Sequence, residues 1–146
     1  VETEEINLAP LVDKALHMFD AKRTERKLEL NKSVDRSVVR TNASLFEILI
    51  NNLISNAYRH SMPGGRVSVT LDSEALRICN SGEPLQQPDR IFDRFHRQSR
   101  STSGTGLGLS IVKKICSLTG FTIDYRYTDG YHCFRISFNG SGNPTN

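Results

Sequence analysis

The sequence predicts an α/β (α+β) two-layer sandwich, in which a mixed, mostly antiparallel sheet of about five strands is covered on one face by three helices. Three segments carry apolar residues at helical spacing, and segments of alternating apolar and polar residues lie between and after them. Consecutive alternating segments are joined by short turns at 72–74 and 129–130, which favours antiparallel pairing.

The first helix is expected over residues 8–19, where apolar residues recur every three or four positions. Asn7 is a good N-cap residue, and Pro10 falls in the first turn, where a missing N–H is tolerated. Short strands are expected at 28–31 and 38–41.

A second helix is expected over residues 44–60 and ends before the turn signal at 63–65. Its predicted core face comprises Phe46, Ile50, Leu53, Ile54 and Ala57. A neighbouring arc carries the polar residues Asn52, Asn56, Arg59 and His60. Amide oxygens suit Mg²⁺ and a guanidinium suits phosphate, so this arc is a candidate site for an anion with a hard cation. The alternative is a solvated polar flank of the helix.

Two alternating strands are expected at 67–71 and 76–79, followed by a long loop over 82–106. Loops of that length in a compact domain are usually functional. The third helix is expected to stop at Gly120. Its predicted core face comprises Leu107, Ile111, Ile115 and Leu118.

A final hairpin pairs 121–127 with 134–138 across Asp129–Gly130. The tail 139–146 is polar and rich in Gly and Asn, which predicts a flexible end. We therefore expect a single domain over 1–138.

Glycines cluster at two places near the long loop. The segment 103–109, Ser-Gly-Thr-Gly-Leu-Gly-Leu, opens the third helix, where glycines let a backbone approach a phosphate closely. It is not a Rossmann fingerprint, because residue 109 is Leu, and no Gly-Lys-Ser/Thr follows as in a P-loop. The segment 80–84, Asn-Ser-Gly-Glu-Pro, ends a strand. A helix cap and an ordinary turn are the respective alternatives.

The loop also contains the segment 91–97, Ile-Phe-Asp-Arg-Phe-His-Arg. Two Phe residues in an arginine-rich loop predict a lid or a partner-docking patch. The alternative is a short helix packed onto the core through Ile91, Phe92 and Phe95.

Composition allows one ordinary domain: the chain has 146 residues, 19 Lys plus Arg and 16 Asp plus Glu, for a net charge of +3. No compact run of Lys and Arg points to nucleic acid, and no stretch approaches the roughly 20 apolar residues of a membrane span. Cys79, Cys116 and Cys133 are odd in number and lack metal-site spacing, so reduced thiols are expected. The absence of an initiator Met suggests an excised fragment.

In this order, four segments resemble the conserved boxes of the catalytic, ATP-binding (HATPase, GHKL) domain of bacterial sensor histidine kinases, which has the Bergerat fold. Residues 52–60 resemble its N box, 91–97 its F box and 104–109 its second glycine box, while 80–84 lie where the first glycine box belongs. The resemblance extends over nearly the whole chain and implies ATP and Mg²⁺ as cofactors.

Carried over by this resemblance, Asn56 is expected to coordinate Mg²⁺, and Asn52 and Arg59 are expected to act in catalysis. The residues expected to bind the nucleotide are Asn52, Asn56, Arg59, His60, Asn80, Gly82, Pro84, Leu85, Phe92, Phe95, Arg97, Gly104, Thr105, Gly106, Leu107, Gly108, Leu109 and Cys133.

Three positions depart from the family pattern. Asn80 stands where the first glycine box usually has an Asp that accepts a hydrogen bond from adenine, and an amide still offers an uncharged acceptor. Pro84 replaces the second glycine of that box. Cys133 stands where the family often has Thr, and a thiol is a poorer hydrogen-bond partner.

The resemblance implies transfer of the γ-phosphoryl of Mg·ATP to a His on a separate dimerisation domain absent from this chain. Hydrolysing relatives carry a Glu on the N-box helix, whereas this chain has Asn52 there and Glu47 about 140° away around the helix. Transfer to a held nucleophile is therefore favoured over attack by water, and the chain alone is not expected to autophosphorylate.

The further partner implied is a response-regulator receiver domain, with no nucleic acid. The domain is expected to be a cytoplasmic monomer, within a homodimeric parent compatible with an inner-membrane anchor. Two alternatives remain: a serine kinase of the anti-sigma-factor type, and a nucleotide-binding module with degenerate catalysis.

Overall fold

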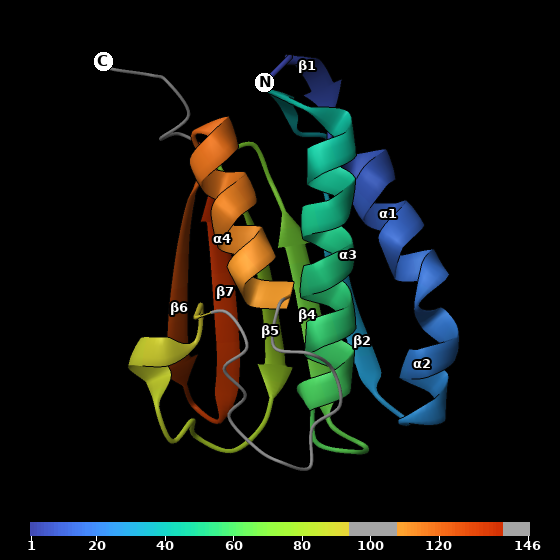
Figure 1. Cartoon of the computed structure of the whole chain (residues 1–146). Coiled ribbons are helices and arrows are strands. Elements are labelled where there is room, and N and C mark those ends of the chain that lie inside the picture. The colour runs from blue at the N-terminus through green and yellow to red at the C-terminus, as the bar shows by residue number, and fades with distance from the viewer. Residues whose placement is uncertain (94–107, 139–146) are drawn as a thin grey trace.

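The computed structural model describes residues 1–93 and 108–138 and has two layers (Figure 1). The main sheet has the spatial order β2-β4-β5-β7-β6. Its strands are β2 (Glu29–Val34), β4 (Arg66–Leu71), β5 (Ala75–Ser81), β6 (Thr122–Thr128) and β7 (Tyr131–Ser137). β2 is parallel to β4, and the other neighbours are antiparallel. The predicted mixed, mostly antiparallel sheet is confirmed.

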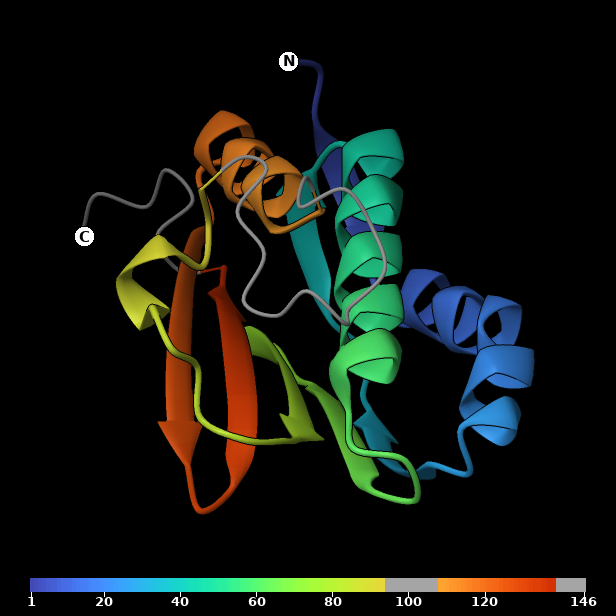
Figure 2. The same ribbon diagram turned by 60° about the horizontal axis from the view of Figure 1, so that its bottom comes forward.

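Three helices cover one face of this sheet: α1 (Ala9–Met18), α3 (Ala43–His60) and α4 (Gly108–Thr119). A shorter helix that the sequence analysis did not predict, α2 (Asp20–Glu25), follows α1. Figure 2 shows α3 between the α1–α2 pair and α4. No helix in the described part of the chain is long and apolar enough to span a membrane.

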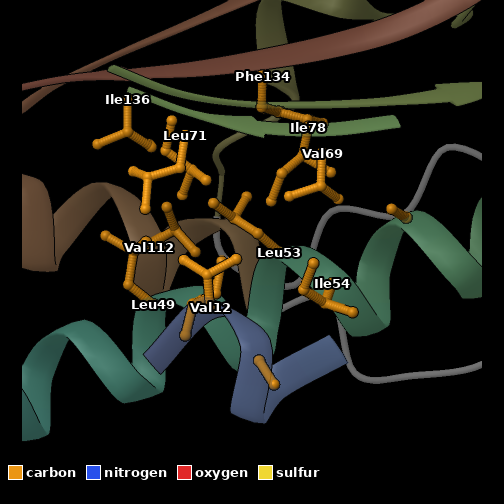
Figure 3. Packing of buried hydrophobic residues seen from close by; sticks show 14 of the residues in the cluster. Val12, Leu49, Leu53, Ile54, Val69, Leu71, Ile78, Val112, Phe134 and Ile136 are labelled. Carbon is orange, nitrogen blue, oxygen red and sulfur yellow. The ribbon is translucent and has the colours of Figure 1, made fainter. Parts of the chain in front are cut away.

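The central helix α3 forms where its predicted core face and a capping residue agree. Asn42 is its N-cap, and the Asn42 Oδ1 accepts a hydrogen bond from the Leu45 N–H at 2.9 Å. All five predicted core residues are buried: Phe46, Ile50, Leu53, Ile54 and Ala57. Figure 3 shows the core between the layers, with Leu49 and Leu53 on the helix side and Val69 and Ile78 on the sheet side.

The predicted core face of α4 is wrong by part of a turn. Ile111 and Leu118 are 37% and 46% exposed, while Val112, Ile115 and Cys116 are buried. The helix carries two overlapping apolar stripes that share Ile115, and packing against α3 selects the second one. Leu107 lies outside the described residues.

The N-terminal segment adds a strand that was not predicted, β1 (Glu4–Asn7). It pairs antiparallel with β3 (Val38–Thr41) in a separate two-stranded sheet. The predicted N-cap is also wrong, because Leu8 occupies that position of α1. Asn7 belongs to β1, and its Oδ1 accepts hydrogen bonds from the N–H groups of Ala9 (3.2 Å) and Ser37 (3.0 Å). It therefore links β1, α1 and the start of the β3 segment.

Both predicted hairpins are confirmed. β4 and β5 pair across the turn at 72–74, where the Asp72 carboxylate accepts hydrogen bonds from two backbone N–H groups. β6 and β7 pair with Ile123 opposite Ile136 and Tyr125 opposite Phe134. The two turn residues between them, Asp129 and Gly130, have φ values of 54° and 83°, as a tight hairpin turn requires.

The expectation of reduced thiols is wrong for two of the three cysteines. The β5–β7 register places Cys79 directly opposite Cys133 with 4.1 Å between their Cα atoms, and a disulfide joins them. The bond lies on the sheet face away from the helices, because the adjacent Phe134 faces the core. Cys116 is free and buried, and burial raises the pKa of its thiol to about 11.

Candidate functional site

The polar arc on α3 lies beside the first residue of α4. Asn52, Asn56, Arg59 and His60 are all half-buried in the second half of α3. The Asn52 Nδ2 donates a hydrogen bond to the Ile48 carbonyl at 2.8 Å. A side chain at Gly108 would bring its Cβ to 3.1 Å from the Asn52 Oδ1. The missing side chain at Gly108 therefore allows the N-terminus of α4 to approach this arc closely.

The Asn56 carboxamide is suited to a hard cation. Among residues 1–93 and 108–138 its side chain has no hydrogen-bond partner, so its carbonyl oxygen is available to a ligand. The same residues contain no group of three His, Cys, Asp or Glu side chains that could hold a metal ion. A single amide oxygen fits a Mg²⁺ ion that takes its other ligands from water and substrate phosphates.

The two basic side chains of the arc differ in charge. Burial, with a smaller contribution from the nearby positive charge of Arg59, lowers the pKa of His60 to about 4. His60 is therefore a neutral imidazole at pH 7, whereas the guanidinium of Arg59 stays charged. Attraction of an anion to this arc depends on Arg59.

The end of β5 is held tightly beside the end of α3. Asn80 is 2% exposed, and its Nδ2 donates to the Ser81 carbonyl at 3.2 Å, which leaves the Asn80 Oδ1 as an acceptor. The Ser81 hydroxyl lies 3.1 Å from that of Ser61 and accepts from the Arg66 N–H at 3.0 Å. These bonds join the end of β5 to the connection between α3 and β4.

Gly82 lies close to the ring of His132, where a side chain would be tightly packed. Its Cβ would lie 3.0 Å from ring atoms of His132 and 3.6 Å from the His60 carbonyl oxygen. A larger residue here would have to displace the His132 ring by a few tenths of an ångström. After it, Pro84 is exposed and Leu85 is half-buried as the chain runs toward the short 3₁₀ helix η1 (Pro88–Arg90).

Phe92 is packed onto the core, as the alternative interpretation of its segment expected. Its ring meets that of Phe134 edge-on, with 6.1 Å between centroids, and the Lys113 Nζ lies 5.5 Å from its centroid. The segment that leads into the predicted lid is thereby attached to β7 and α4.

The remaining predicted site residues are dispersed. Leu109 is half-buried in α4 and contacts the core. Cys133 faces away from the helices in its disulfide, so its side chain does not join the arc. The residues outside the described ranges are Phe95, Arg97, Gly104, Thr105, Gly106 and Leu107.

Glu47 lies on another side of α3, as its angular position predicted. Its carboxylate is 3.9 Å from the Lys14 Nζ on α1. It therefore faces α1, whereas the polar arc faces α4.

Sequence reasoning missed the aromatic and imidazole groups that support Gly82. His132 is buried on β7 between Tyr125 and Tyr127 of β6. The alternation of the last hairpin placed the two tyrosines on its core face, and extending the same alternation to His132 could have placed it beside them.

The sequence matches known proteins of one family. Residues 41–142 match the family described as histidine kinase-, DNA gyrase B-, and HSP90-like ATPase. The sensor histidine kinase HprS of Escherichia coli (strain K12) is 33% identical over 134 residues, which cover 87% of this chain and 28% of HprS. The sensor protein CzcS of Cupriavidus metallidurans is 35% identical over 130 residues, which cover 82% of this chain and 27% of CzcS.

Solved structures give the same result for the fold. The mycobacterial sensor histidine kinase MprB superposes with a TM-score of 0.79 at 26% identity, covering 94% of this chain and 97% of that one. By contrast, the chain spans under a third of the length of HprS and CzcS.

Proposed function

The chain belongs to the family of histidine kinase-, DNA gyrase B- and HSP90-like ATPases, as an ATP-binding catalytic domain of the sensor histidine kinase type, and we propose that it binds Mg·ATP and donates the γ-phosphoryl group to a histidine. The acceptor would lie on a separate dimerisation domain of the parent protein. A response-regulator receiver domain would take the phosphoryl group next.

The observation that carries the proposal is the meeting of three separate segments at the second half of α3. The start of α4 approaches Asn52, and Gly82, just after β5, lies against the His60 carbonyl. Asn80, two residues before Gly82, has an acceptor oxygen for the amino group of adenine. An adenine acceptor, a charged guanidinium and a helix N-terminus near the end of α3 suit a nucleoside triphosphate.

Within this site each side chain has a distinct part. The Asn56 oxygen would be a ligand of Mg²⁺, which would neutralise phosphate charge when bound with ATP. Arg59 would contact phosphate oxygens, and neutral His60 would offer a hydrogen bond without a charge. Positioning and charge neutralisation are what phosphoryl transfer chiefly needs from a protein.

Transfer to a held histidine is preferred over hydrolysis because the arc carries no carboxylate to activate water. The nearest candidate along α3, Glu47, is engaged with Lys14 on the α1 side. We propose residues 1–138 as the catalytic unit and 139–146 as its tail.

The proposal is tested by titrating the chain with a non-hydrolysable ATP analogue in a calorimeter, with and without Mg²⁺. Saturable binding that tightens with Mg²⁺ is expected, and Asn56→Ala should abolish the effect of the metal. Asn31→Ala on β2 is a matched control away from the arc and should behave as the unmodified chain. Equal Mg²⁺ dependence in Asn56→Ala would overturn the metal assignment, and no saturable binding would overturn the proposed function.

A further inference from the structure

We propose that His132 is a positioning residue, which clamps the turn after β5 against the β6–β7 hairpin and so fixes the adenine side of the nucleotide site. This inference rests on the proposed function, because the turn matters only if Asn80 contacts adenine. Figures 1 and 2 both show the chain after β5 passing beside the turn of the β6–β7 hairpin on its way to η1.

Three hydrogen bonds from that hairpin hold two consecutive residues of the turn. The Gly82 N–H donates to the Gly130 carbonyl at 3.1 Å. The Tyr127 hydroxyl donates to the Gly82 carbonyl at 2.9 Å. The His132 Nε2 lies 2.7 Å from the Glu83 carbonyl oxygen. Glu83 is an exposed residue, and its backbone carbonyl is the group that the hairpin contacts.

The partners of His132 select one tautomer. A carbonyl oxygen only accepts, so the Nε2 must carry the proton that it donates to Glu83. The Nδ1 of the neutral ring then accepts from the Tyr125 hydroxyl, 2.7 Å away. Burial lowers the pKa of His132, which favours this neutral form at pH 7. Both ring nitrogens are thus satisfied, and the ring cannot turn without losing a bond.

Neighbouring rings also restrict the His132 ring. The Tyr125 ring is nearly parallel to it, with 5.9 Å between centroids and a 19° interplanar angle, and the Tyr127 ring lies 4.8 Å away. The ring approaches Gly82 so closely that a Cβ there would lie 3.0 Å from it. His132 is also directly opposite Asn80 in the β5–β7 register, so the clamp is adjacent to the proposed adenine acceptor.

A turn held in this way is preorganised for its ligand. Without the clamp, nucleotide binding would have to order the residues after Asn80, and that cost would weaken affinity. Because the clamp acts beside the base rather than the phosphates, its loss should reduce discrimination between adenine and guanine nucleotides as well as affinity.

The test compares two substitutions at one position. His132→Leu removes both hydrogen bonds, whereas the amide nitrogen of His132→Gln can still donate to the Glu83 carbonyl. We expect His132→Leu to weaken binding of the ATP analogue about tenfold, to weaken that of the matching GTP analogue less, and His132→Gln to recover most of the loss. Tyr127→Phe removes only the hydrogen bond to the Gly82 carbonyl and should weaken binding of the ATP analogue several-fold. It provides the test if His132→Leu does not fold.

Imidazole ¹⁵N shifts of the unmodified chain supply a readout without nucleotide. A protonated Nε2 and an unprotonated Nδ1 at pH 7 support the clamp, and the opposite tautomer would overturn it. If the unmodified chain bound no nucleotide, the proposed function would fail while the ¹⁵N shifts still tested the clamp. If it bound normally, unchanged affinity in both His132→Leu and Tyr127→Phe, equal losses for both nucleotides, or no recovery in His132→Gln would overturn the inference.

Discussion

Reduction of the Cys79–Cys133 disulfide should destabilise the fold by several kcal/mol. The two cysteines are 54 residues apart, so the bond closes a long loop in the unfolded chain. The chain-entropy relation gives about 4 kcal/mol for a loop of that length, and the usual range for such bonds is about 2–4 kcal/mol. For a domain of this size, a loss of about 4 kcal/mol corresponds to a fall in Tm of roughly 8–16 °C.

Urea unfolding with and without a phosphine reductant measures this difference directly. The dependence of the free energy of unfolding on urea concentration (the m value) should also increase on reduction, because the unfolded chain without the disulfide exposes more surface. Cys79→Ser/Cys133→Ser is the matched control and should show no response to reductant. A thiol count in denaturant should give one free thiol, that of Cys116, before reduction and three after it. Three thiols without reductant, or unfolding curves that coincide, would refute the reasoning.

Three further predictions follow from the core and the arc. Leu53→Ala should lower the free energy of unfolding by about 2–5 kcal/mol because Leu53 is fully buried. Ile48→Ala, on the exposed side of α3, should lower it by less than about 0.5 kcal/mol. Similar urea midpoints for the two variants would contradict the packing described. In the folded chain His60 stays neutral down to about pH 4, whereas in the unfolded chain it takes up a proton below about pH 6.5. The free energy of unfolding should therefore be highest above pH 6.5 and fall by about 3 kcal/mol toward pH 4. His60→Gln should remove much of this pH dependence, and an unchanged dependence in that variant would show that His60 titrates normally. Asn80→Asp should keep or tighten binding of an ATP analogue, since a carboxylate is the stronger acceptor, and clearly weaker binding in calorimetry would argue against Asn80 as the adenine acceptor.

The parts of the fold that sequence predicted well are those fixed by local pattern. The core face of α3 follows from a single apolar arc with no competing one, and every residue of that arc is buried. The last hairpin follows from alternation on both sides of Asp129–Gly130, which favours the register that places half-buried Tyr125 opposite buried Phe134.

The parts that were missed depend on contacts between distant segments. Nothing local indicates that Cys79 and Cys133 face each other, because that requires the β5–β7 register. The exposed position of Ile111 depends on how α4 packs against α3, which its own two stripes leave open. β1 is too short to be recognised without its partner β3.

The candidate site shows the same division. The α3 arc was predictable because Asn52, Asn56 and Arg59 repeat at helical spacing. The support from His132 was not, since its role depends on the Glu83 carbonyl, 49 residues away in the sequence. Every residue type has a backbone carbonyl, so the sequence does not indicate that the carbonyl of Glu83 contacts His132.

The central claim is that this domain transfers the γ-phosphoryl group of ATP to a histidine outside itself. It is tested most directly by incubating the chain with γ-labelled ATP and Mg²⁺, alone and together with the phosphoacceptor domain of its parent protein. We predict acid-labile, base-stable label on the acceptor domain and none on the chain alone. Label on the chain itself, or acid-stable label of the phosphoserine type, would contradict the account.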